Sequence, residues 1–175
     1  MSGGRLATLS RHLLSIAILP FTVTVLVPLW IARENDVRLE VAGDALHVAA
    51  RVAGVMLIVL GLVLAASTIR WFAKEGKGTL APWDPPRELV VRGAYRYVRN
   101  PMISGVLLVV FGEALALWSR PHLWWALVVL AANLLYIPLV EEPALARRFG
   151  APYEEYRRNV PRIVPRRRPW GVRRS

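Results

Sequence analysis

Four long apolar runs constrain the possible folds of this chain more than any other feature of its sequence. They cover residues 13–32, 52–69, 102–118 and 123–140 of the 175. A helix needs about 20 apolar residues, and at least about 17, to cross the hydrocarbon core of a bilayer. Because no water satisfies backbone polar groups there, each run is expected to be helical. The sequence therefore predicts one all-α polytopic membrane domain over residues 1–175, with about four transmembrane helices.

Composition agrees with a membrane protein and excludes several kinds of chemistry. Hydrophobic residues make up 55% of the chain, and the mean hydropathy is +0.38, above that of an ordinary soluble domain. The absence of cysteine excludes disulfides, thiolate nucleophiles and cysteine metal sites. The three histidines are scattered without ligand spacing, so no metal site is expected.

The basic residues predict the orientation in the membrane. Residues 13–32 are too long for the core of a cleaved signal peptide, and we expect them to remain as an anchor. Of the 23 lysines and arginines, 19 lie in the N-terminal tail, in the segment Arg70–Asn100 and after Val140. Four spans put these segments on one side, which the positive-inside rule makes cytoplasmic. Both termini are therefore predicted to be cytoplasmic, in the plasma (inner) membrane of a prokaryote.

The formal net charge of +11 also suggests a partner. Anionic lipid headgroups attract juxtamembrane lysine and arginine by about 1 kcal/mol per residue. The basic tail, residues 166–175, includes Trp170, which we expect at headgroup depth. Nucleic acid is not expected, because no nucleic-acid-binding module accompanies the charge.

Two polar blocks flank the third and fourth apolar runs. Gly93–Met102 precedes the third run, and Glu141-Glu142 follows the fourth. Because two spans form a hairpin that begins and ends on the same membrane face, the two blocks should meet there. Cationic, backbone-constraining and acidic groups would then converge at the cytoplasmic rim, which predicts a functional site.

Short cytoplasmic elements are expected on both sides of this hairpin. Ala144–Phe149 reads as a short helix, with Pro143 in its first turn and Gly150 placed to end it. Tyr153 and Tyr156 lie three residues apart and could share a helix face, and the chain then leaves helix at Val160. In the long loop before the site, the proline-rich stretch 82–86, with Trp83, is expected to form an ordered cap.

The third apolar run begins with a recognisable signature, Gly93-x-Tyr95-Arg-Tyr-Val-Arg99-Asn-Pro101-Met-x-x-Gly105. It resembles the G-x-Y-x-x-x-R-H-P-x-Y-x-G signature of the isoprenylcysteine carboxyl methyltransferase and phospholipid N-methyltransferase superfamily. A second signature of these integral-membrane methyltransferases is similar to Glu141-Glu142-x-x-Leu145, Phe149-Gly150, Tyr153, Tyr156 and Val160-Pro161-Arg162. The resemblance covers roughly residues 89–165 and both motifs occur in the family's order.

The resemblance implies S-adenosylmethionine as methyl donor and a lipophilic methyl acceptor that enters from the bilayer, with the active site facing the cytoplasm. Arginines suit the donor's carboxylate, since they bind it bidentately, and glutamates suit its ammonium or ribose hydroxyls. The catalytic residues implied are Arg99, Asn100 and Glu142. The cofactor-binding residues implied are Tyr95, Arg96, Arg99, Asn100, Pro101, Gly105, Glu141, Glu142, Tyr153 and Tyr156.

Simpler structural roles compete with this reading. The arginines could be topological charges, the glutamates could favour a helix N-terminus through its dipole, and Gly105 and Gly112 could serve helix packing. The chain also departs from the signature, with Asn100 at the histidine and Ile103 at the second tyrosine. Asparagine does not titrate near neutral pH, so these departures bear mainly on the acceptor.

Isoprenylcysteine carboxyl methylation is the activity that the motif favours, and phospholipid amine methylation is the nearest alternative. An NADPH-dependent membrane reductase and a non-catalytic membrane protein with a degenerate site are two further alternatives. Reductases that resemble this superfamily are usually longer, which counts against that class.

Overall fold

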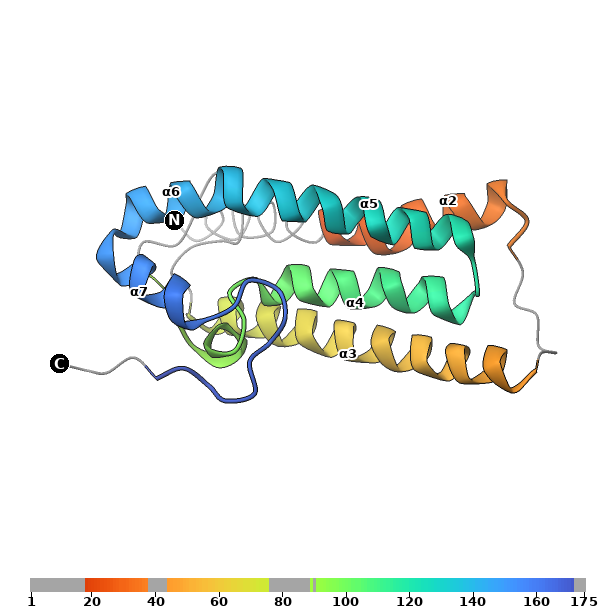
Figure 1. Ribbon diagram of the computed structural model, residues 1–175, viewed down its shortest axis with the longest axis horizontal. Coiled ribbons are helices and arrows are strands. Elements are labelled where there is room, and N and C mark those ends of the chain that lie inside the picture. The colour runs from red at the N-terminus through yellow and green to blue at the C-terminus, as the bar shows by residue number, and fades with distance from the viewer. Residues whose placement is uncertain (1–17, 38–43, 76–88, 90, 172–175) are drawn as a thin grey trace, which may run out of the picture.

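The computed structural model describes residues 18–37, 44–75, 89 and 91–171, and every regular element among them is helical (Figure 1). This confirms the all-α prediction for the described part of the chain. Short π-helical turns at Thr22–Leu26 and Ile137–Glu141 and a 3-10 turn at Gly93–Arg96 complete the elements. The helices are α2 (Val27–Glu34), α3 (Ala45–Glu75), α4 (Pro101–Ala116), α5 (Arg120–Tyr136), α6 (Glu142–Phe149) and α7 (Ala151–Asn159).

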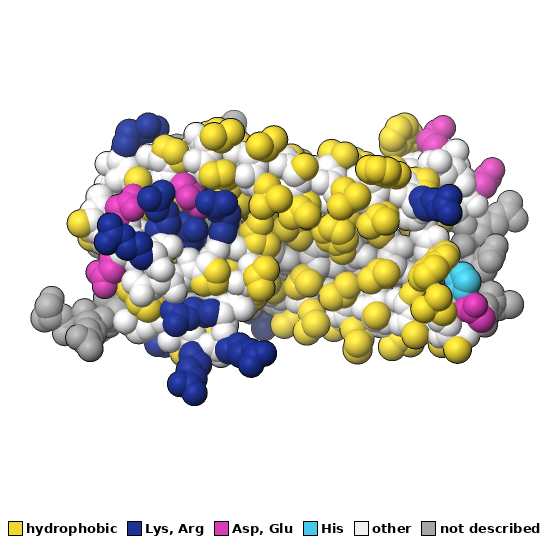
Figure 2. Space-filling model, in the orientation of Figure 1, with side chains coloured by type: hydrophobic (Ala, Val, Ile, Leu, Met, Phe, Trp, Pro, Cys, Tyr) yellow, Lys and Arg dark blue, Asp and Glu magenta, His cyan; other side chains and the backbone are white. Residues whose placement is uncertain are grey.

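Among the described residues, two helices are long and apolar enough to cross a membrane. One covers Ala45–Arg70, with 26 residues, and the other covers Arg120–Phe149, with 30; only 17% of each most apolar window is buried within the protein. A core helix of a soluble protein would be mostly buried. Here an apolar belt, a band of hydrophobic side chains, covers the middle of the face that Figure 2 shows. The apolar helix α4 has 16 residues, about 24 Å at 1.5 Å per residue, so the four-span count remains a prediction.

The second apolar run is the centre of a longer helix than expected. α3 begins at Ala45 and continues to Glu75, so Arg70 lies in the helix and not at the start of a loop. Lysine, arginine and glutamate are good helix formers, which lets a helix continue past the end of its apolar stretch. The predicted cap at residues 82–86 lies outside the described residues.

The predicted short helix with Pro143 in its first turn is present as α6, but no break separates it from the fourth apolar run. α5, the π-helical turn and α6 form one continuous helix from Arg120 to Phe149 (Figure 1). Pro138 and Pro143 both lack the backbone N–H that normally continues a helix. The π-helical turn Ile137–Glu141, which contains Pro138 and ends before Pro143, changes the hydrogen-bond register instead of ending the helix. Gly150, with φ of 58°, then separates α6 from α7, as predicted.

Glycines set the close approach of α3 and α4. A Cβ atom on Gly61 would lie 2.5 Å from the Gly105 carbonyl oxygen, and one on Gly54 would lie 2.4 Å from the backbone nitrogen of Ala116. A Cβ on Gly112 would meet the Gly54 carbonyl oxygen at 2.7 Å. Small residues let helix backbones pack directly in membranes. Gly105 and Gly112 therefore face α3, and the structure uses them for helix packing.

Polar contacts join α5 to the first helical segment. Pro28 has no backbone N–H to donate within the helix. The carbonyl oxygen of Val23, five residues earlier, instead accepts a hydrogen bond from Trp125 Nε1 of α5 at 3.0 Å. His122 is buried, and its Nε2 donates to the Pro28 carbonyl oxygen at 3.2 Å. Its Nδ1 lies 2.7 Å from Ser119 Oγ. Because Val27 donates to the Thr22 carbonyl oxygen, the missing N–H of Pro28 leaves the Val23 carbonyl oxygen without a helical donor, and Trp125 supplies one from α5.

Adding a side chain at the α3–α4 contact is expected to destabilise the fold. Gly61→Val should lower the free energy of unfolding by about 2 kcal/mol or more, because overpacking against fixed backbone usually costs about 1–3 kcal/mol. Thermal unfolding in detergent, followed by size-exclusion chromatography, measures the loss. Ala66→Val on the exposed side of the same helix is the control. Equal stability of the two variants would contradict the direct backbone packing.

Candidate functional site

The α4–α5 hairpin brings the two polar blocks together at one end of the molecule, as predicted. The segment before α4 and the chain from Glu141 onward lie beside each other at the left of Figure 1. The backbone N–H of Arg99 donates to the Pro161 carbonyl oxygen at 2.8 Å, and that of Asn100 donates to the Arg162 carbonyl oxygen at 3.2 Å. The chain after α7 therefore runs alongside the start of α4.

A buried carboxylate lies at the centre of this contact. Glu142 is only 3% exposed, and its Oε1 accepts hydrogen bonds from Arg99 Nη1 at 2.9 Å and from Arg162 Nε at 2.6 Å. Arg157 of α7 approaches Oε2 at 3.7 Å. A buried carboxylate is tolerated only when it is paired and hydrogen-bonded. Glu142 thus joins α6, α7 and the chain on either side of them to the start of α4.

Arg99 is held by more than its ion pair. Its side chain is 9% exposed, and its Nε donates to the Val160 carbonyl oxygen at 2.9 Å. One turn into α4, Ser104 Oγ donates to the Ile163 carbonyl oxygen at 2.6 Å. The side chains of Arg99 and Ser104 therefore fix the path of residues 160–163 against α4.

The second acid of the pair has a different partner. The Asn100 amide nitrogen, in the orientation that satisfies both of its polar atoms, donates to Glu141 Oε1 at 3.1 Å. Glu141 is half-buried, whereas Glu142 is buried. Asn100 therefore holds the Glu141 carboxylate near the start of α4 by a hydrogen bond. Unlike a histidine, it cannot take up or release a proton near neutral pH.

An aromatic cluster packs beside these ions. Tyr153 and Tyr156 are buried on one face of α7, as predicted, with ring centroids 6.3 Å apart. The Tyr156 hydroxyl donates to the Tyr95 carbonyl oxygen at 2.7 Å. Burial raises the pKa of Tyr95, Tyr153 and Tyr156 above the ordinary tyrosine value, so all three stay protonated at physiological pH. The cluster also includes the buried Val160 and the partly buried Leu89, Val91, Leu145, Ala146, Phe149 and Trp170.

We call residues 160–171 the C-terminal strap, because they cross back over the 3-10 turn before α4. The backbone N–H of Trp170 donates to the Arg96 carbonyl oxygen at 2.9 Å, and Arg96 Nε donates to the Trp170 carbonyl oxygen at 2.8 Å. The Arg166 N–H donates to the Tyr97 carbonyl oxygen at 2.9 Å. The Trp170 ring lies 5.7 Å from that of Tyr156. Trp170 is thus packed in the aromatic cluster, where the sequence had suggested a headgroup contact.

The structure separates the predicted site residues into groups. Arg99, Asn100, Glu141 and Glu142 form one polar cluster, and Tyr95, Tyr153 and Tyr156 line its aromatic neighbour. Pro101 begins α4 and is buried. Arg96 binds the C-terminal strap through its Nε, and Gly105 packs against α3.

Sequence reasoning did not assign roles to three polar residues of this site. Arg162 and Arg157 contact Glu142, and Ser104 binds the C-terminal strap. Arg162 had a usable signal, because it lies within the second signature. Ser104 lies one turn after Asn100 in an otherwise apolar helix, which is also a recognisable signal for a polar contact.

Loss of the buried carboxylate is expected to unfold this end of the protein first. Glu142→Gln should lower the free energy of unfolding by about 3 kcal/mol or more, since it leaves the buried Arg99 charge unpaired. Arg162→Gln should cost less, because the Arg162 side chain is 32% exposed and water can reach it. Denaturation by sodium dodecyl sulfate compares both variants with Glu155→Gln, an exposed acid. A Glu142→Gln variant as stable as Glu155→Gln would contradict the anchoring role.

The comparisons with known proteins fall on the same part of the chain. The family described as phospholipid methyltransferase matches residues 49–152. Methanethiol S-methyltransferase 2 of Bradyrhizobium diazoefficiens is 41% identical over 80 residues, which are 41% of this chain and 27% of that protein. The chain thus aligns with only about a quarter of the length of this curated relative. No solved structure matches the chain. Because the family match covers more than half of the 175 residues, the chain belongs to the phospholipid methyltransferase family of membrane methyltransferases.

Proposed function

We propose that the chain transfers a methyl group from S-adenosylmethionine to a lipophilic nucleophile that reaches the polar cluster from the bilayer. The observation that carries the proposal is the buried Arg99–Glu142 ion pair, at 2.9 Å, beside the Asn100–Glu141 contact. The family match and the relative's printed name support methyl transfer. The donor and the acceptor class are our inference from the site.

The residues of the cluster fit the donor's chemistry. S-adenosylmethionine presents a carboxylate, an ammonium and ribose hydroxyls. Arg99 and Arg162 both donate to the single carboxylate of Glu142. Arg157 is shared between Glu142 and Glu154, so one positive charge of this group would remain for the donor's carboxylate. Glu141 is half-buried and presents a carboxylate for the ammonium or hydroxyls. The cluster therefore offers both signs of charge to a zwitterionic ligand.

The bound donor would supply an activated methyl group on a sulfonium sulfur. Arg99 and Glu141 would orient it, because positioning alone can lower a barrier by several kcal/mol. The raised pKa values keep Tyr153 and Tyr156 neutral, so these side chains bring no negative charge beside the site. The packed C-terminal strap would exclude water from one side. Within this proposal the chain's residues mainly orient the reactants.

The acceptor is proposed as one of three nucleophiles. The sequence signature favours a prenylated cysteine carboxylate, the family description points to a phospholipid amine, and the relative's name points to a thiol. Purified protein should be incubated with methyl-labelled donor and each acceptor, and label in the organic extract measured. Transfer to one class assigns it. Binding of NADPH in place of the donor would support the reductase alternative and contradict the proposal.

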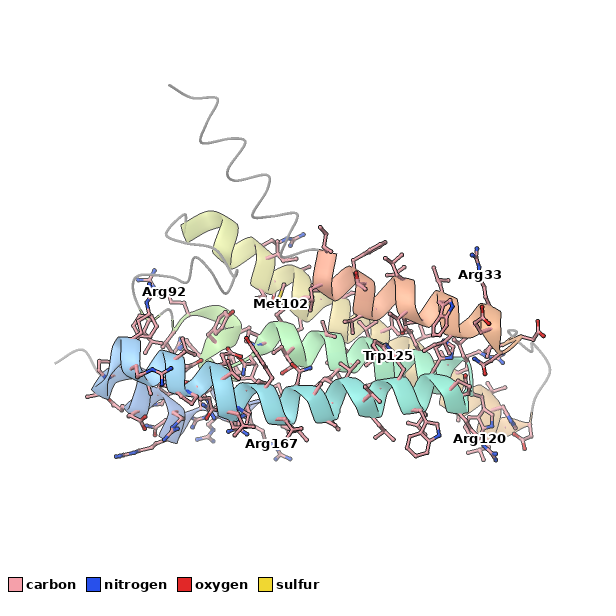
Figure 3. All side chains as sticks on the ribbon, turned by 90° about the horizontal axis from the view of Figure 1, so that it is seen from above. Arg33, Arg92, Met102, Arg120, Trp125 and Arg167 are labelled. Atoms are coloured by element: carbon pink, nitrogen blue, oxygen red, sulfur yellow. The ribbon has the colours of Figure 1, made fainter. Side chains whose placement is uncertain are left out.

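Donor binding should depend on the polar cluster and not on cationic residues elsewhere. Glu141→Gln and Arg99→Lys are each expected to weaken S-adenosylmethionine binding by about 1–3 kcal/mol, the range for a hydrogen bond to a charged group. Calorimetric titration of folded variants in one detergent measures the change. Arg120→Gln, exposed at the opposite end (Figure 3), should bind like the parent. Parent-like binding by both cluster variants would contradict the proposed donor site.

We also propose that the end carrying the cluster faces the cytoplasm, with both termini on that side. Figure 3 places Arg167 in one half of the molecule and Arg33 and Arg120 at the far end. The bias of basic residues toward the first half supports this orientation.

A cysteine-labelling experiment tests the orientation, since the chain has no cysteine of its own. Asn35→Cys should react with an impermeant thiol reagent in intact cells, because Asn35 is exposed at the end that would lie outside. Glu155→Cys, exposed on α7, should react only after the membrane is permeabilised. The reverse pattern would invert the proposed topology.

A further inference from the structure

The surface around the polar cluster carries a strong excess of positive charge. Between residues 143 and 171 the sequence has eight arginines and two glutamates. One of these acids, Glu154, is already paired with Arg157 at 3.0 Å. In Figure 2 the arginines gather at this end, directly beside the apolar belt. The exposed ones among the described residues are Arg147, Arg148, Arg157, Arg158, Arg167 and Arg168.

The opposite end of the molecule has no such excess. Its exposed described charges include the arginines Arg33 and Arg120 and the acids Glu34, Asp36 and Asp44. Asp44 also lies 2.7 Å from His47. Since the two ends border the same apolar belt, the difference in charge distinguishes them electrostatically.

The C-terminal strap presents its arginines in a fixed position. Its backbone is bound at Arg166 and Trp170, through the carbonyl oxygens of Tyr97 and Arg96. Arg166 Nη1 also donates to the Asn159 carbonyl oxygen at 2.7 Å. Between these anchors Arg167 and Arg168 are exposed, and neither makes an ion pair with any residue that the structure describes. Two cations are therefore held outward on an ordered segment.

The C-terminal strap also exposes an apolar residue near these cations. Val164 is 75% exposed, although valine is usually buried in proteins. Val164 lies three and four residues before Arg167 and Arg168, so one short segment offers an apolar side chain to the acyl chains and two cations to the headgroups of a membrane interface.

We propose that the C-terminal strap is a docking surface for anionic phospholipid headgroups. Arg167 and Arg168 bind the lipid phosphates, for which guanidinium groups form strong bidentate hydrogen bonds, and Val164 lies at the acyl boundary. Because the same segment is bound to Arg96 and Tyr97, directly before Arg99, this contact sets the depth of the polar cluster in the membrane. The proposal is independent of the methyl acceptor.

The test is the selectivity of the protein for anionic lipid. The full chain is reconstituted in phosphatidylcholine, and electron spin resonance compares the association of spin-labelled phosphatidylglycerol and phosphatidylcholine. Arg167→Gln/Arg168→Gln should reduce the selectivity about thirtyfold at low salt, which corresponds to about 1 kcal/mol for each of the two arginines at a membrane surface. The parent's selectivity should also fall as salt is raised, because exposed charges are screened.

The control is Arg33→Gln/Arg120→Gln, which removes the same charge from the opposite end and should leave the selectivity unchanged. Equal loss in the control would show a net-charge effect and overturn the proposal. Unchanged selectivity in the variant of the C-terminal strap would do the same. If millimolar inorganic phosphate at constant ionic strength abolished the parent's selectivity, the surface would bind a soluble phosphate, which also contradicts lipid docking.

Discussion

The Glu142 carboxylate is the group on which the rest of the site depends. It projects from a continuous helix and is almost fully buried, where an ionised carboxylate costs several kcal/mol unless it is compensated. Arg99 and Arg162 supply that compensation from segments far apart in the chain. One buried charge therefore requires the start of α4, the start of α6 and the C-terminal strap to assemble together.

The position of this carboxylate follows from two features of the helices, a close contact between α3 and α4 and a π-helical turn. Gly61 and Gly105 let the backbones of α3 and α4 pack directly against each other. This contact fixes where α4 begins and hence where Arg99 and Asn100 lie. The π-helical turn at Ile137–Glu141, which contains Pro138, then changes the hydrogen-bond register before Pro143 without ending the helix. Glu141 and Glu142 keep helical backbone geometry, and each meets a different partner near the start of α4.

The sequence predicts the membrane character, the hairpin and the meeting of the two polar blocks, because these depend on the apolar lengths and on the order of the motifs. It also predicts the shared face of Tyr153 and Tyr156, since helical spacing alone determines it. The order of the motifs does not reveal which neighbour each residue contacts. Arg96 binds the C-terminal strap and Gly105 packs on α3, although both residues lie inside the signature. The continuous helix through Glu141 was not predicted, because two prolines usually indicate a helix break. In the structure a π-helical turn changes the backbone hydrogen-bond register there, and the helix continues.

The arginines at the end of the molecule that carries the polar cluster form an interior set and an exterior set. The two sets differ in how strongly salt screens their charges. Arg99 and Arg162 contact a buried carboxylate, where low dielectric strengthens the interaction and salt screens it weakly. Arg167 and Arg168 face solvent, where salt screens each charge. Under the proposals above, donor binding would draw on the first set and lipid docking on the second. Raising ionic strength should then weaken lipid selectivity well before it weakens donor binding, because salt screens the exposed charges of Arg167 and Arg168 more strongly than the buried pair of Arg99 and Glu142.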